Sequence, residues 1–169
     1  MKKVLLIRHA KSSWDEPELS DFDRPLNKRG KRNAPEMADR LLERNVRVDQ
    51  IISSDALRAK TTAQLLSSAL GHSPNDITFS HKLYLTGTDA YLRLIHQLPD
   101  TFTSVALVGH NPDLTLLANQ LGGLDIDNVP TLGMVYLEFP EIHLWSDVRQ
   151  GQGSLRWFDF PKKPFVGAD

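Results

Sequence analysis

The sequence predicts an α/β fold, a three-layer α/β/α sandwich whose central sheet is mostly parallel. Three observations predict it. Short apolar runs rich in branched residues recur along the 169 residues, segments with helical apolar spacing separate most of them, and the last two runs have no helix-length pattern between them. Strands that alternate with helices imply crossover connections and helices on both faces of the sheet. The last two strands are therefore expected to pair antiparallel at one edge.

Five segments have the composition of strands, at residues 3–7, 50–53, 104–108, 134–139 and 155–160. The first contains the unbroken apolar run VLLI, which is typical of a strand buried on both faces. The connection between the last two strands, EIHLWSDVRQGQG, has the composition of a loop.

The first helix is expected to begin after an N-cap at Asn27. Its apolar residues recur at helical spacing: Ala34, Met37, Ala38, Leu41 and Leu42. Pro35 falls inside this pattern and predicts a kink or a late start.

Three more helices are expected, over residues 56–70, 89–98 and 112–121. Gly71 is placed to end the first of these, and Pro112 stands at a favoured first-turn position of the last.

The length and composition fit one domain over residues 1–169, without a cap insertion. A net charge of -1 gives no general attraction to nucleic acid or to an anionic membrane, so neither is an expected partner. The sequence has no cysteine, which excludes disulfides, thiolate zinc sites and cysteine-based phosphatases.

The N-terminal apolar run is too short for a targeting segment. It follows Lys2-Lys3 but stops at Arg8 after four strongly apolar residues, whereas a signal peptide needs about 7–15. No stretch approaches the roughly 20 apolar residues of a membrane span. A cytoplasmic location is therefore the expectation.

Cationic residues follow three of the predicted strands. Arg8 and His9 come directly after the first, Arg58 opens the helix after the second, and His110 follows the third. Ligands of open α/β sheets bind at the carboxyl ends of the strands, and two of these ends also lead into helix N-termini, which attract anions. Each residue alone is more often structural, but together they predict a cationic pocket suited to a phosphoryl group.

The same segments resemble the histidine phosphatase superfamily, whose signature is a strand followed by Arg-His-Gly. Here the element reads Ile7-Arg8-His9-Ala10, with alanine in place of glycine. DRPLNKRG at 23–30, SSDALRAKTTA at 53–63 and VGHNP at 108–112 are similar to three further segments of the family, in the same order. GSLRWF at 153–158 is similar to the short, SixA-like phosphohistidine phosphatase branch.

The resemblance implies a phosphoglycerate mutase-like fold with His9 as the nucleophile. A neutral imidazole would attack phosphorus to form a phosphohistidine, which water then hydrolyses. Arg8 and Arg58 would hold phosphoryl oxygens through their planar guanidinium groups. His110, protonated or as a neutral donor, would complete the phosphate site.

Three further residues are weaker candidates. Arg24 either contacts phosphate or substrate, or pairs only with Asp21 or Asp23. Asn111 and Ser12 either donate hydrogen bonds to the phosphate, or serve as a cap and a solvated loop residue. The histidines outside the motifs show no paired metal-ligand spacing, so no metal and no cofactor are expected.

A missing carboxylate favours phosphohistidine as the substrate. Mutase and acid-phosphatase relatives carry a general acid for the leaving alkoxide, but residues 82–87, which align with the mutase position, contain none, and Asp89 is the nearest candidate. A phosphoramidate needs less help, because its nitrogen can be protonated before the weak P–N bond breaks. No insertion is long enough for a lid, so an open pocket is expected.

The leading hypothesis is therefore a metal-independent phosphatase that acts on a phosphohistidine-bearing protein. One alternative is a phosphatase for small phosphomonoesters with Asp89 as its acid, and another is a non-catalytic phosphoprotein-binding module. Four residues form the core of the predicted phosphate site: Arg8, His9, Arg58 and His110. The presence of all four core residues counts against the binding module. A basic run flanks the site and is either a solvated face or an attractor of an acidic partner: Lys11, Lys28, Arg29, Lys31 and Arg32.

Overall fold

The computed structural model describes residues 1–167 and is built on a six-stranded sheet with the order β3-β2-β4-β1-β5-β6. The strands are β1 (Lys2–Arg8), β2 (Gln50–Ser54), β3 (Thr78–Ser80), β4 (Ser104–Gly109), β5 (Met134–Phe139) and β6 (Ser154–Asp159). The first four are parallel to one another, whereas β5 runs antiparallel to β1 and β6 antiparallel to β5. The predicted antiparallel edge is confirmed.

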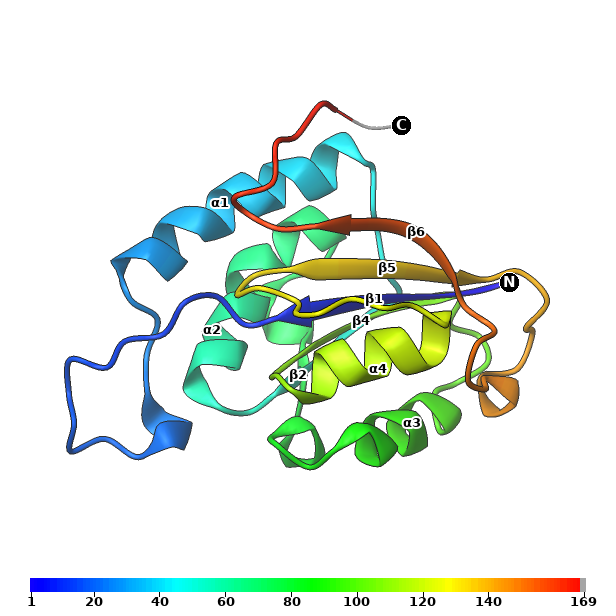
Figure 1. Cartoon of the computed structure of the whole chain (residues 1–169), viewed down its shortest axis with the longest axis horizontal. Helices are drawn as coiled ribbons and strands as arrows, with labels where there is room; N and C mark the ends of the chain where they lie inside the picture. The colour runs from blue at the N-terminus through cyan, green and yellow to red at the C-terminus, as the bar shows by residue number, and fades with distance from the viewer. Residues whose placement is uncertain (168–169) are drawn as a thin grey trace.

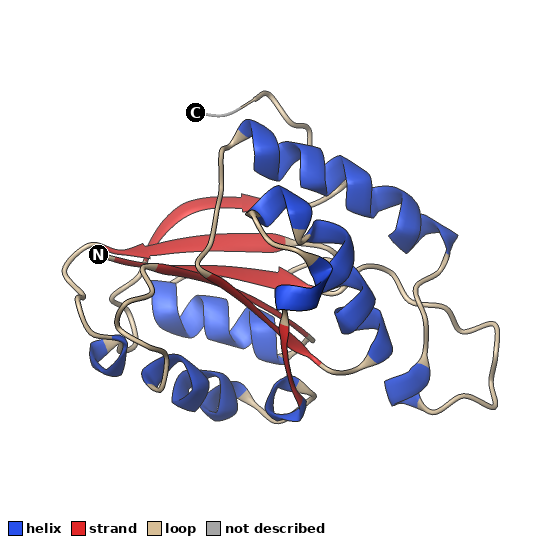
Figure 2. Ribbon diagram, turned by 180° about the vertical axis from the view of Figure 1, so that it is seen from behind, coloured by secondary structure: helices blue, strands red, loops and turns tan. Residues whose placement is uncertain are grey.

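Helices cover both faces of this sheet, as Figures 1 and 2 show from opposite sides. They are α1 (Lys28–Glu43), α2 (Leu57–Leu66), α3 (Thr88–His96) and α4 (Asp113–Gly122). Helices α1 and α2 pack on one face, and α3 and α4 on the other. Short 3₁₀ turns connect the elements: η1 (Asp21–Asp23), η2 (Ser68–Leu70), η3 (Pro74–Asp76), η4 (His81–Leu83) and η5 (Trp145–Asp147). Within residues 1–167, no helix combines the length and apolar character needed to cross a membrane.

Strand β1 lies inside the sheet and is buried on both faces, as its apolar run predicts. Leu5 and Ile7 belong to the core under α1 and α2, whereas Val4 and Leu6 belong to the core under α3 and α4. All four side chains are at most 1% exposed. Packing on both sides fixes the strand, and with it the position of the residues that follow.

The structure differs from the prediction in three elements, which are β3, α1 and the segment that forms α2 and η2. Strand β3 was not predicted, because three residues at a sheet edge are too few to show a pattern. Helix α1 runs from Lys28 directly after its cap at Asn27, so Pro35 does not delay its start. The segment predicted as a helix over 56–70 divides into α2 and η2, and ends at Gly71 with φ 90°.

The register brings three strand ends to one place. Arg8 at the end of β1 pairs with Gly109 of β4, and Ser53 of β2 pairs with Val108 of the same strand. The residues that follow these strands therefore meet at the carboxyl edge of the sheet, which is the left end of the sheet in Figure 1.

Candidate active site

The backbone after β1 holds His9 beside His110. The N–H of His9 donates to the carbonyl of Gly109 at 3.1 Å, and the carbonyl of His9 accepts from the N–H of Leu132 at 3.0 Å. The two imidazole rings lie 5.1 Å apart between centroids and are tilted by 50°. The structure thus places together the two histidines that the strand ends predict.

The hydrogen bonds of His9 define which nitrogen is available for chemistry. Nδ1 lies 2.7 Å from the carbonyl oxygen of Ala10, which can only accept, so Nδ1 carries the proton. The lone pair is then on Nε2, which faces Nε of Arg58 at 3.3 Å. Burial, followed by the neighbouring His110, Arg58 and Arg8, lowers the pKa of His9 well below its usual value. His9 is therefore a neutral base at neutral pH.

His110 is also neutral, and it presents an unused polar atom. Burial above all, and then the charge of Arg58, lowers the pKa of His110 to about 3. Its Nε2 lies 2.8 Å from the hydroxyl of Ser54, whose oxygen also accepts the N–H of Ala56. The Ser54 hydroxyl can therefore donate to Nε2, an arrangement in which His110 carries its proton on Nδ1. Within residues 1–167, Nδ1 is buried without a hydrogen-bond partner.

The two predicted arginines approach His9 from different elements. Arg58 is held in the first turn of α2, and its terminal nitrogens donate to the backbone carbonyl of Asp21 at 2.6 Å and to the carboxylate of Asp21 at 2.9 Å. Nη1 of Arg8 donates to the carbonyl of Val129 at 3.0 Å. In the described part of the chain, Nε of Arg8 is the other buried side-chain nitrogen without a partner.

Asp21 lies within the candidate site, although its sequence context predicts no role beyond a possible ion pair with Arg24. Its carboxylate accepts hydrogen bonds from Arg58, Arg24 and the hydroxyl of Tyr84. Partial burial alone would raise the pKa of Asp21, but these hydrogen bonds lower the pKa to about 2. The only signal in the sequence is its place three residues before Arg24 in DFDRPL.

An aromatic group borders the site on the side of Asp21. The ring of Tyr84 lies edge-on to His110 at 5.3 Å and edge-on to Phe22 at 5.1 Å. His81 lies 5.6 Å from both Phe22 and Tyr84. Sequence reasoning missed this group, because its members come from two short 3₁₀ turns and the residue after one of them.

The weaker candidates differ in what they contact. Arg24 is buried, pairs with Asp21 at 3.1 Å, donates to the hydroxyl of Ser12 at 2.8 Å and stacks on Trp14. Arg24 and Ser12 thus form one buried pair beside Asp21, and their contact with a phosphoryl group remains a prediction.

The side chain of Asn111 is engaged inside the protein. Its Nδ2 donates to Asn128 and to the carbonyl of Val129, both at 2.9 Å. Its Oδ1 accepts from the N–H and the hydroxyl of Thr115. These bonds anchor the start of α4, and a direct bond from Asn111 to phosphate also remains a prediction.

Asp89, the sequence candidate for a general acid, is exposed in the first turn of α3. Within residues 1–167 it forms no ion pair or side-chain hydrogen bond with the four core residues. Across the same residues, no three histidine, aspartate or glutamate side chains come together as a metal site.

Comparison with known proteins decides the family. A model of the histidine phosphatase superfamily (branch 1) matches residues 4–83. The structure of a candidate phosphohistidine phosphatase, SixA, from Agrobacterium tumefaciens is 32% identical, covers 95% of this chain and 98% of its own, and superposes with a TM-score of 0.80. The chain belongs to the histidine phosphatase superfamily. The same superposition confirms its phosphoglycerate mutase-like α/β fold.

Two other relatives of this histidine phosphatase come from Mycobacterium tuberculosis and Arabidopsis thaliana. An uncharacterised protein of Mycobacterium tuberculosis is 29% identical over 167 residues, which are 92% of this chain and all of the relative. A chloroplastic protein of Arabidopsis thaliana is 31% identical over 134 residues, which are 74% of this chain. This match spans 61% of the plant protein's length.

Proposed function

We propose that this histidine phosphatase is a metal-independent enzyme that hydrolyses phosphohistidine on a partner protein, within a single domain and through a phosphorylated His9. The observation that carries the proposal is the state of His9. Its Nδ1 proton is committed to the carbonyl of Ala10, and its Nε2 lone pair faces the guanidinium of Arg58. A buried neutral nucleophile among arginines is what phosphoryl transfer to nitrogen requires.

The first step would begin when a phosphoryl group enters beside Arg8, Arg58 and His110. Its oxygens are stronger acceptors than Nε2, so Nε of Arg58 would turn from His9 to the phosphoryl group. The unpartnered Nε of Arg8 and Nδ1 of His110 would supply two further donors. Nε2 of His9 would then be free to face phosphorus.

The bonds then exchange in line. Nε2 of His9 attacks phosphorus as the P–N bond of the substrate breaks, and the substrate imidazole, protonated beforehand on its other nitrogen, leaves as a neutral ring. The new positive charge on His9 is stabilised by the bond from Nδ1–H to the carbonyl of Ala10. In the second step water attacks phosphorus, the Nε2–P bond breaks, and His9 returns to its neutral state while the proton from water passes to phosphate and solvent.

The choice of a phosphoramidate rests on the acids available at the site. An alkoxide leaving group needs a protonated donor, but a pKa of about 2 keeps Asp21 ionised at neutral pH. The hydroxyl of Tyr84 is committed to Asp21, and Asp89 is exposed on α3. A substrate whose leaving imidazole arrives already protonated on its other nitrogen fits this site best, and the Agrobacterium relative carries the matching name.

The test offers the purified protein a phosphohistidine-bearing protein and p-nitrophenyl phosphate, each with and without EDTA. We expect rapid release of phosphate from the phosphohistidine protein, little from the ester, and no effect of EDTA. His9→Ala should abolish turnover, whereas His143→Ala, at an exposed position, should leave it unchanged.

Each part of the proposal has its own contrary result. Turnover that survives His9→Ala would refute the nucleophile, and loss with EDTA would refute metal independence. Faster hydrolysis of the ester would point to the phosphomonoester alternative, which Asp89→Asn would then check. Tight binding of the phosphoprotein without turnover would identify a binding module.

A further inference from the structure

A cavity lies at the opposite end of the sheet from His9. Its volume is about 720 Å³, and it is lined at the starts of β1 and β4 by Lys3 and Ser104. Along β1, His9 follows Lys3 by six residues, which is about 20 Å at the usual rise of a strand. A molecule bound in this cavity would not touch the candidate active site.

The cavity is strongly cationic although the whole chain has a net charge of -1. Four cationic side chains line it with one carboxylate, that of Glu138: Lys3, Arg44, Arg47 and Arg156. Glu138 lies 3.7 Å from Lys3, and Arg44 is paired with Asp159 at 2.6 Å. Within residues 1–167, the guanidinium groups of Arg47 and Arg156 make neither an ion pair nor a hydrogen bond.

The loop that carries two of these arginines is fixed before any ligand arrives. After α1, Asn45 takes a left-handed conformation with φ 51°, and Asn45 and Val46 donate backbone hydrogen bonds to Leu42 and Leu41. This is a Schellman arrangement, which closes the helix end. The hydroxyl of Ser104 donates to the carbonyl of Arg47 at 3.3 Å and ties the loop to β4.

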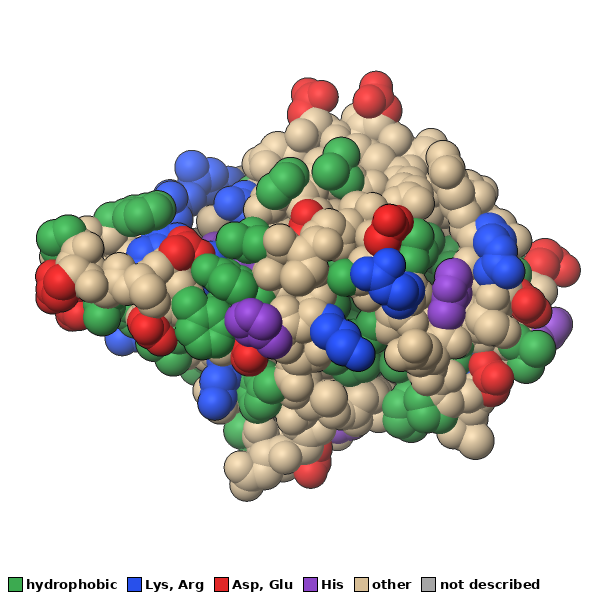
Figure 3. Space-filling view, turned by 90° about the horizontal axis from the view of Figure 1, so that it is seen from below, with side chains coloured by type: hydrophobic (Ala, Val, Ile, Leu, Met, Phe, Trp, Pro, Cys, Tyr) green, Lys and Arg blue, Asp and Glu red, His purple; other side chains and the backbone are tan. Residues whose placement is uncertain are grey.

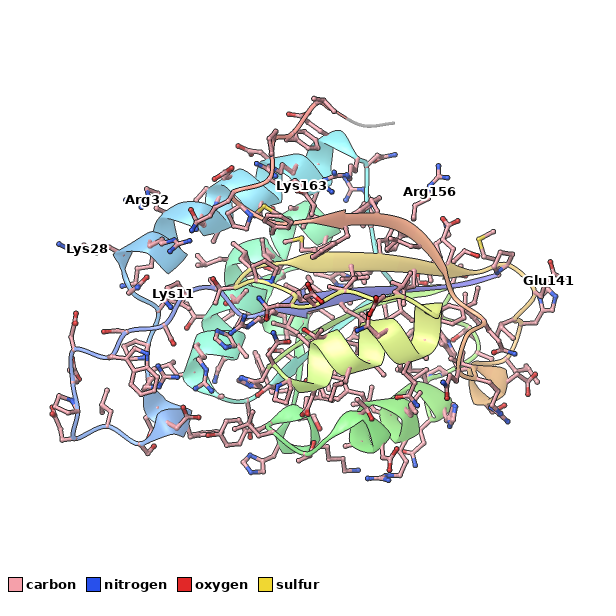
Figure 4. All side chains as sticks on the ribbon, in the orientation of Figure 1. Lys11, Lys28, Arg32, Glu141, Arg156 and Lys163 are labelled. Carbon is pink, nitrogen blue, oxygen red and sulfur yellow. The ribbon has the colours of Figure 1, made fainter. Side chains whose placement is uncertain are left out.

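One wall of the cavity is aromatic. The rings of Tyr136 and Trp157 lie 5.3 Å apart, and Arg44 covers Trp157 at 4.5 Å. Arg156 projects from β6 beside this wall, at the end of the sheet away from Lys11, Lys28 and Arg32 (Figure 4).

We propose that this cavity binds an oligophosphate, either as a free chain or as part of a nucleotide. Planar guanidinium groups bind phosphate oxygens two at a time, and Arg47 and Arg156 have no acidic partner in the described chain to compete for them. The volume lies within the range of small-molecule sites and exceeds what one phosphate needs. The proposal is independent of the proposed catalytic function, because it shares no residue with it.

The test is an NMR titration of ¹⁵N-labelled His9→Ala protein, which prevents turnover, with tripolyphosphate and, separately, ATP. We expect saturable shifts of the backbone amides of Arg47, Thr103 and Ser104 and of the indole N–H of Trp157. Shifts of the backbone amides in the loop that contains His110 would report binding at the candidate active site instead. Tighter binding of ATP would identify a nucleotide site, and equal affinities would identify a site for the phosphate chain alone.

Matched variants decide whether the cavity itself binds. Arg47→Glu with Arg156→Glu should weaken binding by about tenfold or more, and the milder Arg47→Gln with Arg156→Gln should act in the same direction if the reversal unfolds the protein. Arg93→Glu with Lys162→Glu changes the net charge equally at exposed positions that do not line the cavity. Absence of saturable shifts at millimolar ligand, or an equal loss in the control pair, would overturn the proposal.

Discussion

Asp21 organises the arginines of the candidate site, although it would not touch the reacting atoms. Its backbone carbonyl and carboxylate together hold both terminal nitrogens of Arg58, and the same carboxylate holds Arg24. A guanidinium bound in this way loses less freedom when it meets a phosphoryl group. The charge of Asp21 also partly offsets that of Arg58, which would otherwise hold phosphate more tightly.

Asp21→Asn separates these two effects. We expect kcat to fall roughly tenfold to hundredfold, because Arg58 is less well positioned. We expect inorganic phosphate to become a stronger competitive inhibitor, because a negative charge has been removed from beside the guanidinium. Steady-state kinetics with the phosphohistidine protein measure both.

Asp23→Asn is the matched control, since Asp23 lies in the same 3₁₀ turn and its carboxylate bonds only to the hydroxyl of Ser20 within the described residues. It should leave both constants within about twofold of the wild type. An unchanged kcat in Asp21→Asn would exclude the positioning role.

The buried histidines make stability depend on pH. The pKa of His110 is lowered to about 3 and that of His9 is well below 6.5, whereas both titrate near 6.5 in the unfolded chain. Below pH 6.5 the unfolded chain therefore binds more protons, and the free energy of unfolding falls as pH falls. Each histidine contributes a slope of up to about 1.4 kcal/mol per pH unit.

Urea unfolding at pH 7.5, 6.5, 5.5 and 4.5 measures this slope. His110→Asn should make it shallower, whereas His143→Asn, at an exposed position, should keep the wild-type slope. Asp21 adds a further decrease in the free energy of unfolding only as the pH falls from about 3.8, its pKa in the unfolded chain, to about 2, its pKa in the folded protein. Identical slopes in the wild type and His110→Asn would show that His110 does not titrate differently on unfolding.

The site residues that could be predicted from the sequence are those that directly follow a strongly apolar strand. Arg8 and His9 follow an apolar strand, and His110 follows another, so their meeting follows from parallel strands alone. Asp21 lies in a loop with several acidic residues and no periodicity. Its contact with Arg58 depends on a 3₁₀ turn that only the folded chain defines.

The same division holds for the elements. Helix α1 was predictable because Asn27 caps it through a bond from the N–H of Gly30 to the Asn27 side chain at 2.8 Å and its apolar face repeats regularly. Strand β3 was not predictable from the sequence. It has three residues, which show no local pattern, and it forms only by pairing with β2. The late start predicted from Pro35 is wrong, because the hydrogen bond from the N–H of Gly30 to the side chain of Asn27 places the first turn of α1 at Lys28.

Gly30 is where α1 meets the loop that follows His9. A Cβ at this position would lie 2.3 Å from the backbone carbonyl oxygen of Lys11, and a backbone atom cannot swing away as a flexible side chain can. We expect Gly30→Ala to destabilise the protein by about 1–3 kcal/mol. Thermal unfolding followed by circular dichroism measures the change.

Asn33→Ala in the same helix provides the control, and it should change stability by about 0.7 kcal/mol at most. Because the loop from Lys11 includes Ser12, which Arg24 contacts, Gly30→Ala should also lower kcat. Wild-type stability in Gly30→Ala would mean that helix and loop separate freely.

Charge is distributed unevenly around the mouth of the site. The loop that projects at the left of Figure 3 carries acidic and apolar side chains, with lysine and arginine side chains gathered beside it. Lys11, Lys28 and Arg32 lie toward the end of the sheet at which β1 ends (Figure 4). A small phosphoramidate would meet only the phosphate site, whereas a partner protein would also cover this basic flank.

The difference between these two substrates gives a test of the flank. Lys28→Glu with Arg32→Glu should lower kcat/KM for a phosphohistidine protein with an acidic surface by about tenfold at low salt, because steering by opposite charge raises the association rate. This decrease in kcat/KM should become smaller as NaCl is raised to about 0.5 M, because salt screens exposed charges. For free phosphoramidate, kcat/KM should stay within about twofold, since Lys28 and Arg32 are exposed side chains that a small substrate at His9 does not need to contact. Arg93→Glu with Lys162→Glu, away from this flank, controls for net charge. Equal losses for both substrates would mean that the flank acts through the field at His9, and no loss for either would leave it a solvated helix face.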